Sequence, residues 1–114
     1  MGGSNQRTGA RGEAKAAAWY EARGGVVVAR NWRCRDGEID LVVRCDRTLV
    51  FCEVKTRRSD AFGLPAEAVT ATKRARIRHL AARWLDESGV RPQAVRFDVA
   101  SVLAGRVEII QDAF

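Results

Sequence analysis

The chain has 114 residues, of which 46% are hydrophobic and 30% are charged, and its net charge is +6. That length matches one domain with a single core, and no apolar run approaches the roughly 20 residues that span a bilayer. The composition therefore excludes a membrane protein and is typical of a soluble globular domain.

The cysteines and the N-terminal residues indicate a reducing compartment. Cys34, Cys45 and Cys52 lack the C-x-x-C spacing, and the chain has one histidine, so neither a zinc site nor a disulfide framework is expected. The first residues are polar and basic, without the apolar stretch of a secretory signal. We therefore expect a cytoplasmic protein that is disordered over residues 1–7 and forms one domain over residues 8–114.

The first half of the chain predicts a helix followed by three strands. Strong helix formers are concentrated between Gly9 and Arg23, with Thr8 as the expected N-cap and Gly24 as the first stop signal. Three runs of strand-forming residues follow, at residues 26–32, 38–44 and 48–56.

The second half predicts a loop, a longer helix and two more strands. Gly63 and Pro65 favour a loop over residues 59–68, and apolar residues at helical spacing predict a helix over residues 69–87. Strands are expected at residues 94–102 and 106–111. The fold class is therefore α/β (α+β), with a mixed sheet of about five strands flanked by helices in the order αβββαββ.

The second and third strands predict a hairpin centred on Asp46-Arg47. In a symmetric hairpin, residues whose numbers sum to 93 face each other, so Asp40 lies opposite Glu53 and Glu38 opposite Lys55. Because Asp46-Arg47 is not a favoured two-residue turn, a four-residue loop with the same centre is expected as readily. Alternation then puts six apolar residues on one face: Ile39, Leu41, Val43, Val50, Cys52 and Val54.

The opposite face of the hairpin brings two like charges together. Asp40 opposite Glu53 is unfavourable unless water screens the two carboxylates or a divalent cation lies between them. The nearly continuous apolar runs around them indicate strands covered on both faces, where unpaired carboxylates are costly, so we favour the cation. Lys55 shares this face with Glu53; it balances Glu38, or it holds an attacking water and offsets charge on a phosphate.

Basic residues are concentrated in one segment of the chain. The segment from Lys55 to Trp84 carries the whole net charge of +6, because only Asp60 and Glu67 oppose its basic side chains. Such a segment is typical of a protein that binds the phosphate backbone of nucleic acids, although an arginine-rich helix in solvent has the same composition. The candidate phosphate contacts are Arg57, Arg58, Lys73, Arg74, Arg76 and Arg78.

Several motifs resemble those of the YraN family of bacterial proteins. They are R-G-E-A at residues 11–14, N-W-R-C-R-D-G-E-I-D-L-V at 31–42, V-F-C-E-V-K-T-R-R at 50–58 and F-G-x-P-x-E-A-V-x-x-x-K at 62–73. E-x-K alone is common by chance, whereas G-E-I-D thirteen residues before E-V-K is a specific combination. The resemblance covers roughly residues 8–88.

The resemblance implies a minimal restriction-endonuclease-like fold of the PD-(D/E)xK type, related to archaeal Holliday-junction resolvases. It implies that Glu13, Asp40, Glu53 and Lys55 form the active site. Without it, Glu13 is better explained by its favourable place in the first turn of a helix. Cys52 and the Asp46-Arg47 turn depart from the family's usual aliphatic residue and Asp-Gly turn.

Two hypotheses of function follow from these residues. The first is a phosphodiesterase acting on DNA, branched or single-stranded, with Asp40 and Glu53 binding Mg²⁺ or Mn²⁺. The second is a nucleic-acid-binding adaptor that keeps the fold without turnover. A homodimer is expected only by analogy with the resolvases.

Overall fold

A computed structural model describes residues 3–57 and 70–114, and the side chains of residues 10–57 and 70–114. Its elements are α1 (Gly3–Glu21), β1 (Val26–Cys34), β2 (Gly37–Cys45), β3 (Thr48–Arg57), α2 (Ala71–Ser88), β4 (Ala94–Leu103) and β5 (Arg106–Ile110). This order confirms the predicted fold class. The predicted loop at residues 59–68 lies outside the described residues.

The strands form one five-stranded sheet in the order β1-β2-β3-β4-β5. β3 and β4 are parallel and are connected through α2, whereas the other neighbours are antiparallel. The sheet is therefore mixed, and the parallel pair places the C-terminal ends of β3 and β4 side by side, at Arg57 and Leu103.

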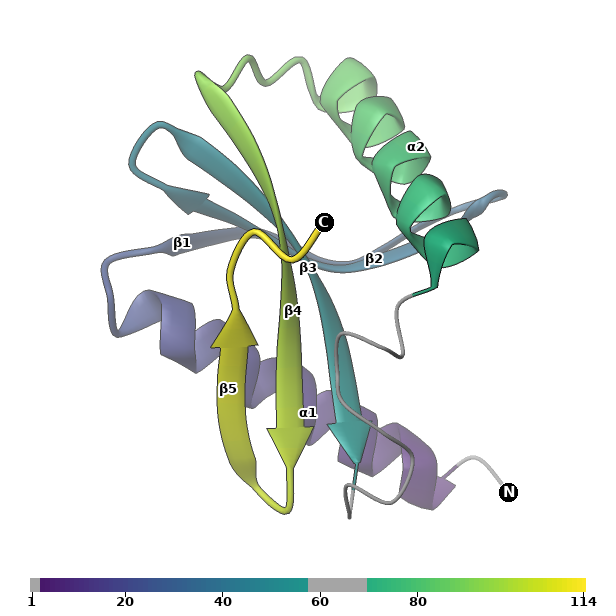
Figure 1. Cartoon of the computed structure of the whole chain (residues 1–114), viewed down its shortest axis with the longest axis vertical. Helices are drawn as coiled ribbons and strands as arrows, with labels where there is room; N and C mark the ends of the chain where they lie inside the picture. Colours follow the sequence, from purple (N-terminus) through teal and green to yellow (C-terminus); the bar gives the residue numbers. More distant parts are fainter. Residues whose placement is uncertain (1–2, 58–69) are drawn as a thin grey trace.

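The two helices cover opposite faces of this sheet, as Figure 1 shows. One core cluster packs Ala16, Ala17 and Tyr20 of α1 against the α1 face of the strands. The other packs α2 against Phe51 and the rest of the opposite face. Since both faces are covered, the central strands are apolar on both sides, which explains the continuous runs LVV and LVFCEV.

Both helices differ from their predicted bounds at the N-terminal end. α1 begins at Gly3 rather than Gly9, so it includes residues 3–7, for which the sequence predicts disorder, and Thr8 lies within it instead of capping it. α2 begins at Ala71, because the Thr70 side chain accepts a hydrogen bond from the Lys73 backbone N–H. Within the described residues, neither helix is long and apolar enough to cross a bilayer.

The β2–β3 hairpin has the predicted register and a shorter turn than the four-residue alternative. Cys45 pairs with Thr48, so the turn has two residues, and Asp46 adopts a φ of 55°. Aspartate tolerates this left-handed conformation better than most residues, which explains why no longer loop is needed. The pairs from Cys45↔Thr48 to Leu41↔Cys52 all follow the predicted sum.

Beyond Leu41 the two strands diverge, and here the predicted hairpin is wrong. β2 continues to pair with β1 as far as Gly37, whereas β3 continues beside β4 as far as Arg57. Figure 1 shows β2 running out beneath α2 while β3 descends beside β4. The divergence also breaks the predicted alternation, because Ile39 packs in the α2-side cluster and not with Leu41.

Candidate active site

The candidate site lies where β2 separates from β3. The last described pair of their ladder is Leu41↔Cys52, so Asp40 and Glu53 are not a ladder pair. Instead, Asp40 Oδ2 accepts a hydrogen bond of 2.8 Å from the Val54 backbone N–H. The carboxylate therefore takes the place of a strand carbonyl and holds the diverging strands together.

Asp40 is buried beside a second carboxylate. It is 8% exposed, and its carboxyl group is within hydrogen-bonding reach of Glu53. Burial, and then the negative charge of Glu53, raise the pKa of Asp40 to about 7, and the Val54 N–H only partly opposes them. The like-charge proximity predicted for these two residues is confirmed, although the geometry that produces it differs from a symmetric hairpin.

Lys55 is close to Glu53, as the alternation along β3 requires. Its Nζ is 3.9 Å from Glu53 Oε1, which is long for an ion pair, and both side chains are about a quarter exposed or less. The predicted Glu38–Lys55 opposition does not form, because Glu38 has moved away with β2. Glu38 instead forms an ion pair of 3.0 Å with Arg33 of β1.

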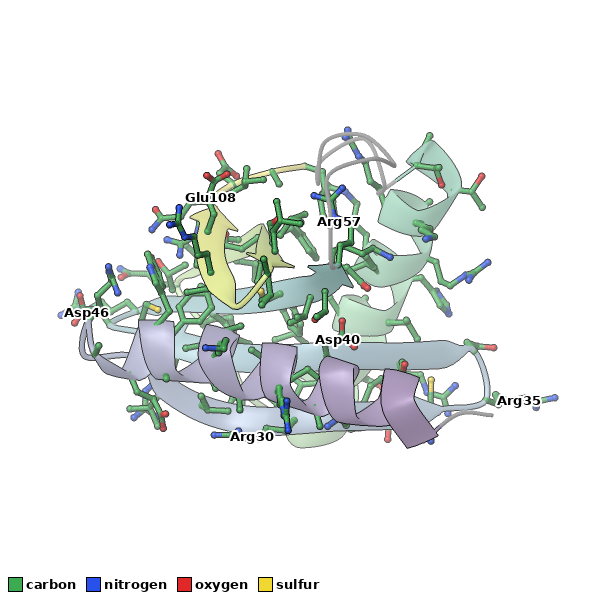
Figure 2. All side chains as sticks on the ribbon, turned by 90° about the horizontal axis from the view of Figure 1, so that it is seen from below. Arg30, Arg35, Asp40, Asp46, Arg57 and Glu108 are labelled. Atoms are coloured by element: carbon green, nitrogen blue, oxygen red, sulfur yellow. The ribbon has the colours of Figure 1, made fainter. Side chains whose placement is uncertain are left out.

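Glu13 reaches the same region from α1. Burial raises its pKa, a hydrogen bond with the Asn31 side chain opposes that rise, and the charge of Asp40 adds to it. Gly12 makes this approach possible, because a Cβ there would clash with the Thr56 hydroxyl oxygen. The structure therefore brings Glu13 into the electrostatic neighbourhood of Asp40, as the resemblance implies. In Figure 2, Asp40 lies beside α1.

Lys73 joins the site from the first turn of α2. Contact with Lys55 lowers the pKa of Lys73, and Glu53 acts on it in the opposite direction. The sequence named this lysine only as one of the candidate phosphate contacts. The structure puts two lysines beside the Glu53 carboxylate.

The remaining predicted phosphate contacts separate into two groups. Arg76 is exposed and contacts the β2 end near Gly37, on the side of the helix that carries Lys73. Arg74 and Arg78 lie over aromatic rings instead, Arg78 at 4.8 Å from Phe97. Arg57 ends β3, and Arg58 lies outside the described residues.

Sequence reasoning missed Asn31, which meets Glu13, and it missed Arg11 and Lys15 of α1, which line a cavity beside Thr56. Asn31 has a φ of 49° inside β1, which allows its side chain to meet Glu13. Asn31 begins the motif at residues 31–42 and Arg11 begins the motif at residues 11–14, but neither motif specified a role for them, and Lys15 had no signal beyond its charge.

Comparison with known proteins supports the motif assignment. Residues 12–102 match the model of the family described as uncharacterised protein family UPF0102, and this range contains all four candidate site residues. A UPF0102 protein of Beutenbergia cavernae is 60% identical over 98 residues, which cover 86% of this chain and 83% of the relative. A UPF0102 protein of Nocardia farcinica is 56% identical over 101 residues, covering 89% and 80%. The chain therefore belongs to family UPF0102, in agreement with the YraN-type motifs in its sequence.

Proposed function

We propose that the protein is a metal-dependent nuclease that hydrolyses phosphodiester bonds in DNA, with Asp40 and Glu53 binding Mg²⁺ or Mn²⁺. The observation that carries the proposal is the juxtaposition of the Asp40 and Glu53 carboxyl groups at the strand divergence, with Lys55 beside them. Carboxyl groups with a perturbed pKa next to a cationic side chain are more frequent at functional sites than elsewhere.

The two carboxylates fit a hard divalent cation. Their proximity in a partly buried place is unfavourable without one, as the raised pKa of Asp40 reflects. Among the described residues no three Asp, Glu, His or Cys side chains are grouped as metal ligands. Magnesium commonly takes only one or two protein carboxylates and completes its shell with water and substrate phosphate oxygens. A bound Mg²⁺ or Mn²⁺ would activate water and polarise the phosphate.

The other side chains of the site suit the substrate's negative charge. Lys55 and Lys73 lie together beside Glu53, so they can stabilise the charge that develops on a phosphate during hydrolysis. Glu13, with its raised pKa and its Asn31 partner, is placed to accept a hydrogen bond from a water molecule. These roles require the acidic and basic groups together, which a binding adaptor does not.

The substrate class follows from the charges around the site. Arg76 lies on the same side of α2 as Lys73, and Arg57 ends the strand that carries Glu53 and Lys55. Positive groups on two sides of the carboxylates favour a polyanion, and we propose branched or single-stranded DNA.

A substrate panel tests the proposal. Purified protein is incubated with duplex, single-stranded, flapped and four-way DNA in the presence of Mg²⁺ or Mn²⁺, beside Asp40→Ala and Lys55→Ala. We expect the wild type to cleave at least one substrate and both variants to lose that activity. Cleavage that persists in both variants would refute the site, and binding without cleavage by the wild type would favour the adaptor.

A further inference from the structure

A basic cavity adjoins the candidate site. It has a volume of about 270 Å³ and lies between α1, the C-terminal end of β3 and the turn that connects β4 to β5. Its lining includes the cations Arg11 and Lys15 of α1 and the Arg57 residue that ends β3, and the described residues that line it include no acidic side chain. We call it the α1 pocket.

The shape of the α1 pocket results from small residues at close approaches. Gly12 allows α1 to pass against Thr56, and the turn contributes Ala104 and Gly105, which leave open space because they have little or no side chain. The Ala104 N–H donates a hydrogen bond of 3.1 Å to the Arg57 carbonyl, which fixes the turn against β3. The pocket is therefore formed by regular elements and one tight turn.

The α1 pocket is next to the candidate site along the chain, both on α1 and on β3. Gly12 directly precedes Glu13 on α1, and Thr56 and Arg57 directly follow Lys55 on β3. Thr56 lies against Gly12 and so faces α1, whereas Lys55 and Arg57 follow the alternation of β3 to the other face. A phosphate held in the pocket would thus lie beside the candidate site, at the C-terminal end of the strand that carries Lys55.

We propose that the α1 pocket binds the phosphate of a nucleotide that adjoins the scissile bond. Arginine and lysine are the side chains that bind phosphate oxygens, and two of them, Arg11 and Lys15, line a cavity just below the usual size range of ligand sites. The pocket takes either a terminal phosphate of a strand or an internal phosphate of its backbone. The identity of the strand rests on the proposed function, whereas binding requires no turnover.

The turn residue Ala104 offers a matched pair of variants. It is exposed and has a φ of 50°, a conformation that asparagine and aspartate adopt more readily than other residues, so Ala104→Asp and Ala104→Asn should both fold. Only the aspartate puts a negative charge at the pocket. A second pair, Lys15→Glu and Lys15→Gln, changes an exposed helix position in the same way without altering the turn.

A distant basic cavity provides the charge control. It is lined by Arg44, Arg47 and Arg91 and lies at the β2–β3 turn, which Figure 2 marks with Asp46, away from Arg57 and Asp40. The double variants Arg11→Ala/Lys15→Ala and Arg44→Ala/Arg47→Ala remove the same charge from the two places. A general electrostatic effect would weaken DNA binding equally in both.

The experiment measures binding of short fluorescent single-stranded DNA by anisotropy in EDTA, so that cleavage does not contribute. The strands carry a 5′-phosphate, a 3′-phosphate or only hydroxyl ends, and one is circular. We expect Ala104→Asp and Lys15→Glu to bind about tenfold more weakly than their amide partners. The α1 double variant should reduce the salt slope by about one to two units, and the control double variant should leave it nearly unchanged.

Each outcome decides the proposal. Loss confined to one phosphate-ended strand assigns a terminal phosphate, and equal loss on the circular strand assigns an internal one. Equal affinities of the aspartate and asparagine variants for every strand would overturn the proposal, as would a wild type that binds none of them. Binding that shows the expected losses, from a protein that cleaves no substrate, would refute the proposed function while leaving the pocket assigned.

Discussion

The Asp40 carboxylate accepts its hydrogen bond from the Val54 N–H at the point where β2 leaves β3. This contact fixes a carboxylate beside Glu53, where burial and repulsion disfavour its ionised form. The same residue therefore stabilises the divergence of the strands and carries an electrostatic cost. Because of that cost, changes at Asp40 should alter the free energy of unfolding as well as the activity.

Stability should depend on pH through Asp40. The folded-state pKa of Asp40 is raised from 3.8 to about 7, so its contribution is fully present below about pH 4 and is lost as the pH rises through 7. Asp40→Asn keeps an oxygen for Val54 and removes the ionisation. In EDTA, we expect this variant to exceed the wild type in free energy of unfolding at pH 8, by on the order of 2 kcal/mol, with a smaller difference at pH 5. Urea unfolding at both pH values checks this, and an unchanged difference would contradict it.

Divalent cations should offset the repulsion between Asp40 and Glu53 and so stabilise the folded protein. A cation that binds the folded protein at about 100 times its dissociation constant adds about 2.7 kcal/mol to the free energy of unfolding. We expect Mg²⁺ or Mn²⁺ to raise the melting temperature of the wild type, and to raise it far less in Asp40→Asn and Glu53→Gln. Glu108→Gln, a change at an exposed carboxylate of β5, is the control and should keep the full rise. Thermal unfolding with and without the metal decides this, and equal rises in all four proteins would exclude a cation at the two carboxylates.

The arginines of α2 should separate into DNA-binding and structural residues. Arg76 is exposed near Lys73, so Arg76→Ala should reduce the slope of DNA affinity against salt by about one unit with little change in stability. Arg78 lies over the Phe97 ring, so Arg78→Ala should lower the free energy of unfolding by about 1 kcal/mol and leave the salt slope nearly unchanged. Salt titrations of binding and urea unfolding measure the two quantities. The opposite assignment of effects would contradict the contacts.

The buried Asp98 should be a structural residue rather than part of the site. It is fully buried and accepts hydrogen bonds from the Tyr20 hydroxyl at 2.6 Å and from Arg96 and the Asp112 N–H. Tyr20→Phe removes one donor from a buried carboxylate, so we expect a loss of about 1 to 3 kcal/mol in the free energy of unfolding. The rise in melting temperature produced by metal should remain. Urea and thermal unfolding check both parts, and loss of the metal effect would connect Asp98 to the site.

The helices, the strands and the part of the β2–β3 hairpin next to its turn were predicted from the sequence because local patterns determine them. Alternation and the Asp46-Arg47 centre were enough for the register from Cys45 to Leu41. The divergence beyond Leu41 could not be predicted from one hairpin, since it depends on β3 pairing with β4, more than forty residues later in the chain. The site's geometry is a consequence of that distant pairing.

Side-chain contacts that tertiary packing creates could not be predicted from the sequence either. Lys73 meets Lys55 because Thr70 fixes where α2 starts and tertiary packing brings that first turn of α2 to β3, which no periodicity specifies. Phe114 at the C-terminus stacks on Phe97 at 5.2 Å, although nothing in the tail marks it as part of the core. By contrast, the motif resemblance selected Glu13, Asp40, Glu53 and Lys55 as candidate site residues without knowledge of their geometry.

The most direct test of the account is the single-turnover cleavage rate on the preferred DNA substrate with Mn²⁺. We expect Asp40→Asn and Lys55→Ala to cleave at least about 100-fold more slowly than the wild type, a cost of about 2.7 kcal/mol in the transition state. Glu108→Gln should cleave within a few-fold of the wild type. Wild-type rates in Asp40→Asn and Lys55→Ala would contradict a metal-dependent nuclease site at these residues.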